Sequence, residues 1–219
     1  MRKGDFDIYF KDAQTQGPGQ PILVGEADES PLGWTLDGRG ILANETQPDG
    51  SHLVRVFPAD GSARDPETIL DAEGVNAASI SPDGRWLAFS SSRGGKHEVY
   101  VKPYGPAGSG PEVRVSRRGG QRAAWSPDGT ELYYTRGHAI VALGYEVDGD
   151  RFLPGEEQVL FESPLLFDYS GHPLPTVGRR RFLVTLREEP PGGERGRPDV
   201  RVVLNWQREV EERFAEARR

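Results

Sequence analysis

One short motif occurs three times in this chain of 219 residues, and its spacing is the strongest constraint on the fold. Residues 77–91 read AASISPDGRWLAFSS, a close copy begins at Arg122, and a looser copy begins at Pro31. Each copy contains one Asp-Gly pair, at Asp37, Asp83 and Asp128. These aspartates lie 46 and 45 residues apart, which is the length of one four-stranded propeller blade. The sequence therefore predicts a β-propeller.

Each copy contains the residues of a tight turn between two strands. The turn residues are Asp37 and Gly38 in the first copy, Ser81, Pro82, Asp83 and Gly84 in the second, and Ser126, Pro127, Asp128 and Gly129 in the third. Proline pre-sets φ at the first central position, aspartate accepts backbone N–H groups, and glycine takes the positive φ that closes the hairpin. The first copy has Leu36 in place of proline. We assign all these residues a structural role and no catalytic one.

The strand that follows each turn is apolar on both faces. In the second copy, for example, Leu87 and Ala88 are adjacent and must point to opposite sides. A sheet with one wet face would instead alternate apolar and polar residues. We therefore expect each sheet to be covered on both sides by its neighbours, as in a propeller. We also expect Trp34, Trp125 and Trp206 to pack between blades rather than to stack on bases.

The pattern predicts an all-β domain of four-stranded antiparallel blades at 1–206 and a short amphipathic helix at 207–219. We expect whole blades at 31–72, 76–117 and 121–163, an incomplete blade at 5–27, and a worn blade at 170–206. The worn blade has a hairpin whose turn allows two alignments, with either Val177-Gly178 or Gly178-Arg179 at the Asp-Gly positions. About four to five blades are therefore present.

Ring closure has two solutions at this stage. An open ring leaves apolar faces and strand edges in water, so the ring must be completed in some way. Either residues outside this chain complete a larger ring of the six-bladed type, or the N-terminal strands complete the last blade of a four-bladed ring. The larger ring predicts that the isolated chain self-associates through unpaired blade edges, or binds a hydrophobic dye.

Composition excludes several classes of function. The formal net charge is −7, so we expect no nucleic-acid partner, and we interpret Arg179–Arg181 as a solvated basic cluster. The chain contains no cysteine, which excludes disulfides and thiolate catalysis. No apolar run approaches a membrane span, and the N-terminus has no signal-peptide pattern. No phosphate loop, kinase motif or hydrolase nucleophile elbow is found.

We predict no metal site and no cofactor. His52, His97, His138 and His172 lie near strand ends or loops, at spacings that do not suggest convergence on a metal. Asp148 and Asp150 flank a glycine, but the segment lacks the further ligands of a calcium loop. We interpret that segment as a β-turn.

An ordered set of motifs resembles a known family. FDIYFKDA, the repeated hairpins, DGDRFLPGEEQVLFE, RRFLVTL and VVLNWQREVEERF follow one another in the order found at the C-terminal part of TolB-like propellers, which are WD-repeat-like. In particular, the chain resembles the propeller behind the kinase domain of membrane-anchored bacterial serine/threonine kinases. The resemblance covers Phe6 to about Phe214. It implies a six-bladed type of ring, and a kinase domain and membrane helix that this chain does not contain.

The resemblance implies a non-catalytic module that binds or senses a protein or small ligand at one propeller face. Kinase activity is not carried over, because no residue here matches a kinase motif. Localisation follows only from context, and a membrane-anchored kinase would place the propeller outside the cytoplasm. Two alternatives stay open, namely the propeller of a prolyl-oligopeptidase-type serine peptidase and a TolB-type periplasmic translocation factor.

Overall fold

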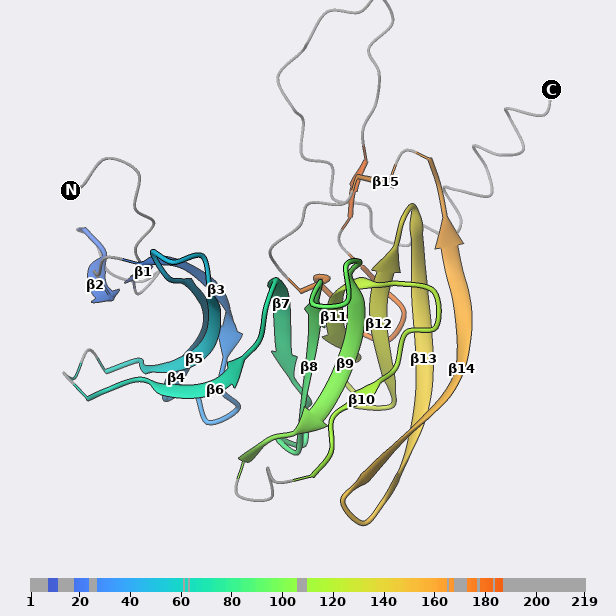
Figure 1. Ribbon diagram of the computed structural model, residues 1–219, viewed down its shortest axis with the longest axis horizontal. Helices are drawn as coiled ribbons and strands as arrows, with labels where there is room; N and C mark the ends of the chain where they lie inside the picture. The colour runs from blue at the N-terminus through green and yellow to red at the C-terminus, as the bar shows by residue number, and fades with distance from the viewer. Residues whose placement is uncertain are drawn as a thin grey trace, which may run out of the picture.

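The computed structural model describes residues 8–11, 18–23, 27–60, 62, 64–105, 110–164, 166–167, 173–176, 178–182 and 184–186. Within these ranges the chain forms β-strands and no α-helix (Figure 1). Three four-stranded antiparallel sheets follow one another along the chain, so the predicted all-β propeller fold is confirmed. The helix predicted at 207–219 lies outside the described residues.

Each four-stranded sheet is one blade, with its strands in chain order from one edge to the other. The first blade consists of β3 (Asp28–Trp34), β4 (Gly40–Thr46), β5 (His52–Pro58) and β6 (Glu67–Asp71). The second blade consists of β7 (Val75–Ile80), β8 (Trp86–Ser91), β9 (Glu98–Pro103) and β10 (Val113–Arg114). The third blade consists of β11 (Gln121–Trp125), β12 (Glu131–Arg136), β13 (Ala139–Asp148) and β14 (Arg151–Glu162).

Two smaller sheets flank the three blades. β1 (Ile8–Phe10) pairs with β2 (Gln20–Leu23), and β15 (Leu166–Phe167) pairs with β16 (Thr185–Leu186). Figure 1 shows β1 and β2 beyond the first blade, on the opposite side of the molecule from β14 and β15. A closed four-bladed ring would require the N-terminal strands to pair with the last sheet. In the described part of the chain they do not.

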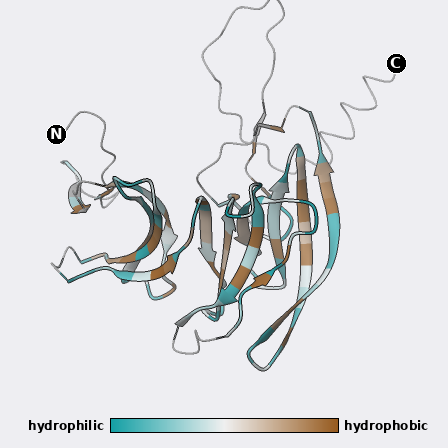
Figure 2. Ribbon diagram, viewed as in Figure 1, coloured by the Kyte–Doolittle hydropathy of each residue, from teal (hydrophilic) through white to brown (hydrophobic). Residues whose placement is uncertain are grey.

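The seams between blades hold the hydrophobic core. Leu87 is 0% exposed and packs with Leu42 and Phe89 between the first and second blades. The next residue, Ala88, is also 0% exposed and packs with Trp125 between the second and third blades. The prediction that one strand is covered equally on both faces is confirmed. Figure 2 shows hydrophobic residues along these strands and hydrophilic residues in the long hairpin between β13 and β14.

Trp34 and Trp125 occupy the same repeat position, three residues before the Asp of the turn, but they differ in burial. Trp125 is 5% exposed, and its Nε1 donates to the carbonyl oxygen of Ser79 at 3.1 Å, so its packing between blades is confirmed. Trp34 also lies between two sheets, but its side chain is 51% exposed. Trp34 faces the preceding sheet, which has two strands among the described residues, and its ring packs edge-to-face with Phe10, with 5.8 Å between ring centroids. Trp206 lies outside the described residues.

The worn hairpin has a shorter turn than the other three. Thr176 pairs with Phe182 and encloses five residues, whereas Ile80 and Leu87 enclose six. Neither of the two alignments considered above has this length. The buried Phe182 ring packs against Tyr133 of the third blade, with 4.8 Å between ring centroids. The hairpin therefore covers the far face of the third blade.

Candidate interaction face

The hairpins between the second and third strands of each blade lie at one end of the molecule, which is uppermost in Figure 1. We call this end the upper rim; it comprises the hairpins 47–51, 92–97 and 137–138 and the connections between blades at 72–74 and 117–120. The Asp-Gly turns lie at the opposite end, the lower end. The two ends have different chemistry, so each is considered separately.

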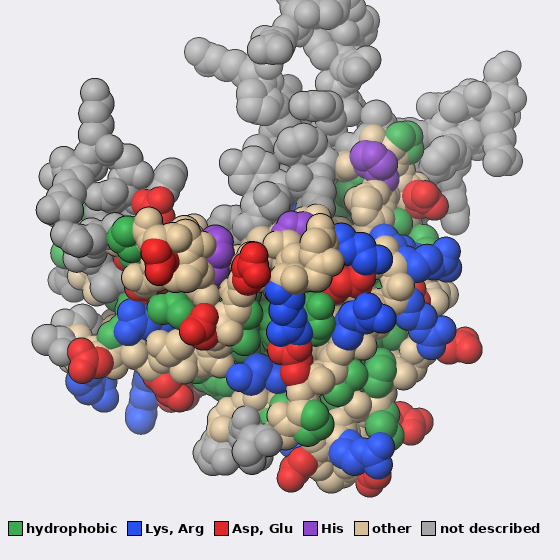
Figure 3. Space-filling view, viewed as in Figure 1, with side chains coloured by type: hydrophobic (Ala, Val, Ile, Leu, Met, Phe, Trp, Pro, Cys, Tyr) green, Lys and Arg blue, Asp and Glu red, His purple; other side chains and the backbone are tan. Residues whose placement is uncertain are grey.

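One histidine stands in or directly after each hairpin of the upper rim, where it precedes or begins the third strand. Figure 3 shows histidine side chains along the upper edge of the molecule. His52 Nδ1 lies 3.4 Å from Thr46 Oγ1, and His97 Nδ1 lies 3.4 Å from Asn76 Nδ2. His138 Nδ1 lies 3.1 Å from a backbone carbonyl oxygen. Each ring therefore has its own partner, and the described residues contain no cluster of His, Asp or Glu able to hold a metal.

Polar side chains join the blades just below the upper rim. Asn44 Nδ2 donates to the carbonyl oxygen of Val75 at 3.3 Å, which links the first blade to the second. Asn76 Nδ2 lies 3.4 Å from Gln121 Oε1 and links the second blade to the third. These bonds add to the apolar seams. Because interiors packed in this way are only slightly deformable, the rim presents its loops at fixed angles.

At the lower end, each repeated aspartate is engaged in its own turn. Asp128 Oδ1 accepts from Ser126 Oγ at 2.7 Å and from the Thr130 backbone at 3.2 Å, and Asp37 accepts from Thr35 in the same way. Gly38, Gly84 and Gly129 have φ values of 67°, 71° and 68°. The Ser126 bond, followed by those of Thr130, lowers the pKa of Asp128 to about 2. A carboxylate held charged in this way is a poor general acid at neutral pH.

Two arginines of the Arg179–Arg181 cluster form ion pairs with a carboxylate of the third blade. Arg180 Nη2 donates to Glu131 Oε1 at 2.6 Å, and Arg179 Nε lies 3.5 Å from Glu131 Oε2. The Glu131 side chain is only 7% exposed, and Tyr133 donates its hydroxyl to the same carboxylate. The Arg180 contact is the main cause that lowers the pKa of Glu131. The sequence interpretation as a solvated cluster was therefore wrong for Arg180, which fastens the worn hairpin to the blade.

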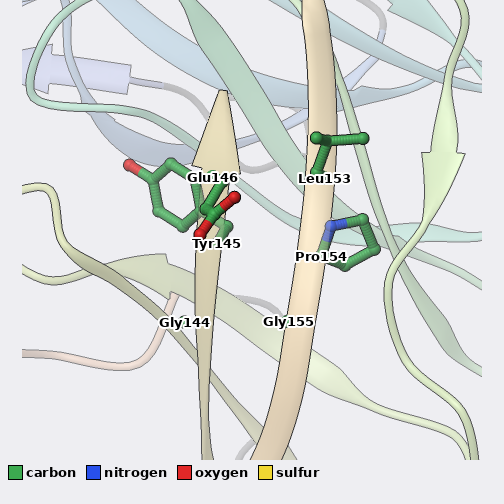
Figure 4. A pocket seen from close by; sticks show the side chains of 6 residues that line it. All are labelled: Gly144, Tyr145, Glu146, Leu153, Pro154 and Gly155. Carbon is green, nitrogen blue, oxygen red and sulfur yellow. The ribbon is translucent and has the colours of Figure 1, made fainter. Parts of the chain in front are cut away.

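A shallow hollow of about 380 Å³ lies between β13 and β14 (Figure 4). It is lined by Gly144, Tyr145, Glu146, Leu153, Pro154 and Gly155. The strands approach closely there, since a Cβ on Gly155 would lie 2.7 Å from the Gly144 carbonyl oxygen. Glu146 is its only ionisable carboxylate, so the hollow offers no acid–base pair. We attribute it to the irregular register of the two strands.

Sequence reasoning missed the arginines on the outer edge of the second blade. Arg114, Arg117 and Arg118 are exposed; Arg114 ends β10, and the other two stand in the connection that follows it. No motif marks them. Counting charged residues blade by blade could have found them. Residues 75–118 contain seven Lys or Arg and three acidic residues, although the whole chain has a net charge of −7.

The fold is similar to solved TolB structures. A protein from Agrobacterium tumefaciens that is assigned as TolB matches with a TM-score of 0.59 and 22% identity over 79% of this chain and 62% of its own. TolB from Acinetobacter baumannii matches with a TM-score of 0.53 and 21% identity over 80% of this chain and 41% of its own. A periplasmic gluconolactonase from Pseudomonas aeruginosa matches at a TM-score of only 0.41, with 21% identity over 68% of this chain and 47% of its own. No family model and no curated protein matches the sequence.

These comparisons show that the chain has the fold of a TolB-like β-propeller. The chain spans less than two thirds of the length of both TolB structures. No helix among the described residues is long and apolar enough to span a membrane.

Proposed function

We propose that this chain is a non-catalytic β-propeller module that binds a protein or small ligand through its upper rim. The observation that carries the proposal is the rigid alignment of three hairpins and two connections at one end of tightly packed blades. Propellers use such loops for recognition, because the sheets hold them at fixed positions. The aspartates at the lower end are engaged in turns, which favours the upper rim over the lower end.

We further propose that the module belongs to a membrane-anchored bacterial serine/threonine kinase, where it would work outside the cytoplasm. The order of sequence motifs supports this context. The similarity to TolB structures favours a second candidate, a TolB-type periplasmic translocation factor. The genomic sequence upstream separates the two. An in-frame kinase domain and membrane helix would support the first, and an export signal followed by a TolB-type N-terminal domain would support the second.

Site-specific photocrosslinking tests the role of the upper rim. A photoreactive residue would replace Asp49, Lys96 or His138, one exposed rim residue in each blade. The matched controls at the lower end are Asp60, Arg85 and Asp150, which are also exposed. In cells of the native host, the rim positions should crosslink to one common partner, and the lower positions should not. Equal crosslinking from both ends, or crosslinking from the lower end alone, would contradict the proposal.

A further inference from the structure

The outer edge of the second blade carries three exposed arginines with no ion-pair partner in the described part of the chain. We call Arg114, Arg117 and Arg118 the arginine edge. Arg114 lies in β10, the outermost strand of the blade, and the other two stand in the connection to β11. Figure 3 shows Lys and Arg side chains gathered over this part of the molecule. The edge is therefore a local excess of positive charge.

The carboxylates that contact the connection after β10 are paired with cations outside the arginine edge. Glu98 Oε1 lies 3.1 Å from Lys96 Nζ, and Glu157 Oε2 lies 2.6 Å from Arg136 Nη1. Burial opposes the ionisation of both carboxyl groups, but their hydrogen bonds and ion pairs lower the pKa of each. Both are therefore charged at neutral pH, and each charge is balanced by a base that is not part of the arginine edge.

The same two carboxylates hold the backbone of the connection. The N–H of Arg117 donates to Glu157 Oε1 at 2.7 Å, and the N–H of Gly119 donates to Glu98 Oε2 at 3.2 Å. Gly119 has a φ of 90°, a conformation that favours glycine. The connection is thus fastened on both sides of Arg118. A fixed backbone reduces the entropy lost when a ligand binds to its side chains.

The neighbouring blades have the opposite charge. Residues 28–71 of the first blade contain nine acidic and three basic residues, and residues 121–162 of the third contain eight acidic and three basic residues. Their outer strands expose Glu67 and Asp71 on β6 and Glu156 and Glu162 on β14. The positive edge is therefore one blade wide and lies between two negative blades.

We propose that the arginine edge binds a short acidic segment of a partner protein, with glutamate or aspartate side chains paired to the arginines. This inference rests on the proposed function and names the chemistry of the partner. Arginine pairs well with carboxylates because its planar group donates two parallel hydrogen bonds. Arg114, Arg117 and Arg118 present three guanidinium groups within five residues, more than one small carboxylate can pair with. A long polyanion or a membrane plane would also meet the two acidic blades and be repelled.

Binding of a short fluorescent peptide of alternating glutamate and serine to the full chain tests this inference. The same peptide with glutamine in place of glutamate is the uncharged comparison. Fluorescence anisotropy should show about tenfold tighter binding of the glutamate peptide, which corresponds to a few exposed ion pairs. The triple substitution Arg114→Gln, Arg117→Gln and Arg118→Gln should remove this difference.

A second triple variant matches the change in net charge. Arg39→Gln, Arg64→Gln and Arg151→Gln remove three exposed arginines from the first and third blades. This control should bind the glutamate peptide within about twofold of the original chain, because surface pairs act locally at ordinary salt. An equal loss in both triple variants would overturn the inference. Tighter binding to duplex DNA or to phosphatidylserine vesicles than to the glutamate peptide would also overturn it.

The two failures are distinguishable. Rim crosslinks to a partner, together with no peptide binding at the arginine edge, would remove this inference and leave the proposed function intact. Crosslinks that come only from the lower end would remove the proposed function, even if the peptide binds at the edge. Chemical unfolding of both triple variants checks that they fold, and we expect changes within about 0.5 kcal/mol because all six side chains are exposed.

Discussion

The first and second blades share one topology and one turn, but they differ in cover and in charge. The second blade is buried on both faces, with Leu87 and Ala88 each 0% exposed. The first blade is covered on one face by the second blade, whereas its other face packs against the smaller β1–β2 sheet, and there Trp34 is 51% exposed. The blade repeat therefore specifies the sheet, and the neighbour decides whether the same repeat position is core or surface.

The charge difference has a separate origin. Most basic residues on the second blade stand in hairpins, in the outer strand or in the connection that follows it, and are exposed. The first blade uses acidic residues at similar places, such as Glu67 and Asp71. Packing does not require this difference. The proposed recognition at the rim and the outer edge would account for it.

The largest expected effect is the loss of stability when one of the two tryptophans at the same repeat position is replaced by alanine. Trp125→Ala should destabilise the chain by about 3–5 kcal/mol, because it empties a packed seam. Trp34→Ala should cost about 1–2 kcal/mol, because half of its side chain is already in water. Urea unfolding followed by circular dichroism would measure both variants. Equal losses would mean that Trp34 is covered, and the contrast between the two blades would fail.

Dye binding gives a second view of the same contrast. The original chain should bind a hydrophobic dye through the partly covered face that contains Trp34. Trp34→Ser should reduce the fluorescence of the bound dye, and Val159→Ser, on the exposed outer strand of the third blade, should reduce it less. Equal reductions would show that the first blade has no special apolar face.

A smaller effect concerns the buried carboxylate of the second blade. Glu98→Gln should destabilise the chain by about 1 kcal/mol near neutral pH, because the carboxylate accepts from Ser116 and pairs with Lys96. The pKa of Glu98 is lowered by folding, so its contribution is present above the unfolded value of about 4.3. That contribution is lost as the pH falls through the lower folded pKa.

Unfolding free energies measured across this acidic range would therefore fall less steeply in Glu98→Gln than in the original chain. Glu67→Gln, on the exposed outer strand of the first blade, is the matched control and should change stability by less than about 0.5 kcal/mol. Parallel pH profiles for Glu98→Gln and the original chain would show that this carboxylate does not anchor the rim.

The fold was predictable because its signals are local. The Asp-Gly turns and the apolar runs beside them lie within about fifteen residues of each other, and they predicted the second strand of each blade. The fourth strand of the third blade is longer than its apolar run at 158–162 suggests, because β14 begins at Arg151. The two-residue turn at Gly149 and Asp150 starts that strand early, since Asp148 pairs with Arg151. The sequence indicated a turn at Gly149, but it did not indicate that Asp148 and Arg151 pair on either side of it.

The arginine edge was not predictable from local patterns. Whether Arg117 is in excess depends on Glu157, forty residues away, and on the pairing of that carboxylate with Arg136. The exposure of Trp34 also depends on a different sheet. Sequence spacing identifies the elements of a repeat fold, but the balance of charge between elements requires their arrangement in space.

The smallest expected effect returns to the turn that distinguishes the first blade. Leu36 stands where the second and third copies have Pro82 and Pro127. The turns are nevertheless closed by the same backbone hydrogen bond. Gly38 N donates to the carbonyl oxygen of Thr35 at 2.9 Å, and Gly84 N donates to that of Ser81 at 2.9 Å. Leu36→Pro should therefore stabilise the chain by about 0.4–1 kcal/mol, mainly by restricting the unfolded state.

The reverse change, Pro82→Leu, should destabilise the chain by a similar amount, and urea unfolding resolves both if they are measured side by side. The loss of one contact opposes the stabilisation expected for Leu36→Pro. Leu36 Cδ1 lies against Gly84 of the next turn, and the substitution removes this contact. Pro82 makes a looser version of that contact with Gly129, which shows that proline can occupy the position beside a neighbouring turn. Destabilisation by Leu36→Pro would mean that the first turn is tuned to its neighbour through Leu36, and that the blades differ in their turns as well as in their cover and charge.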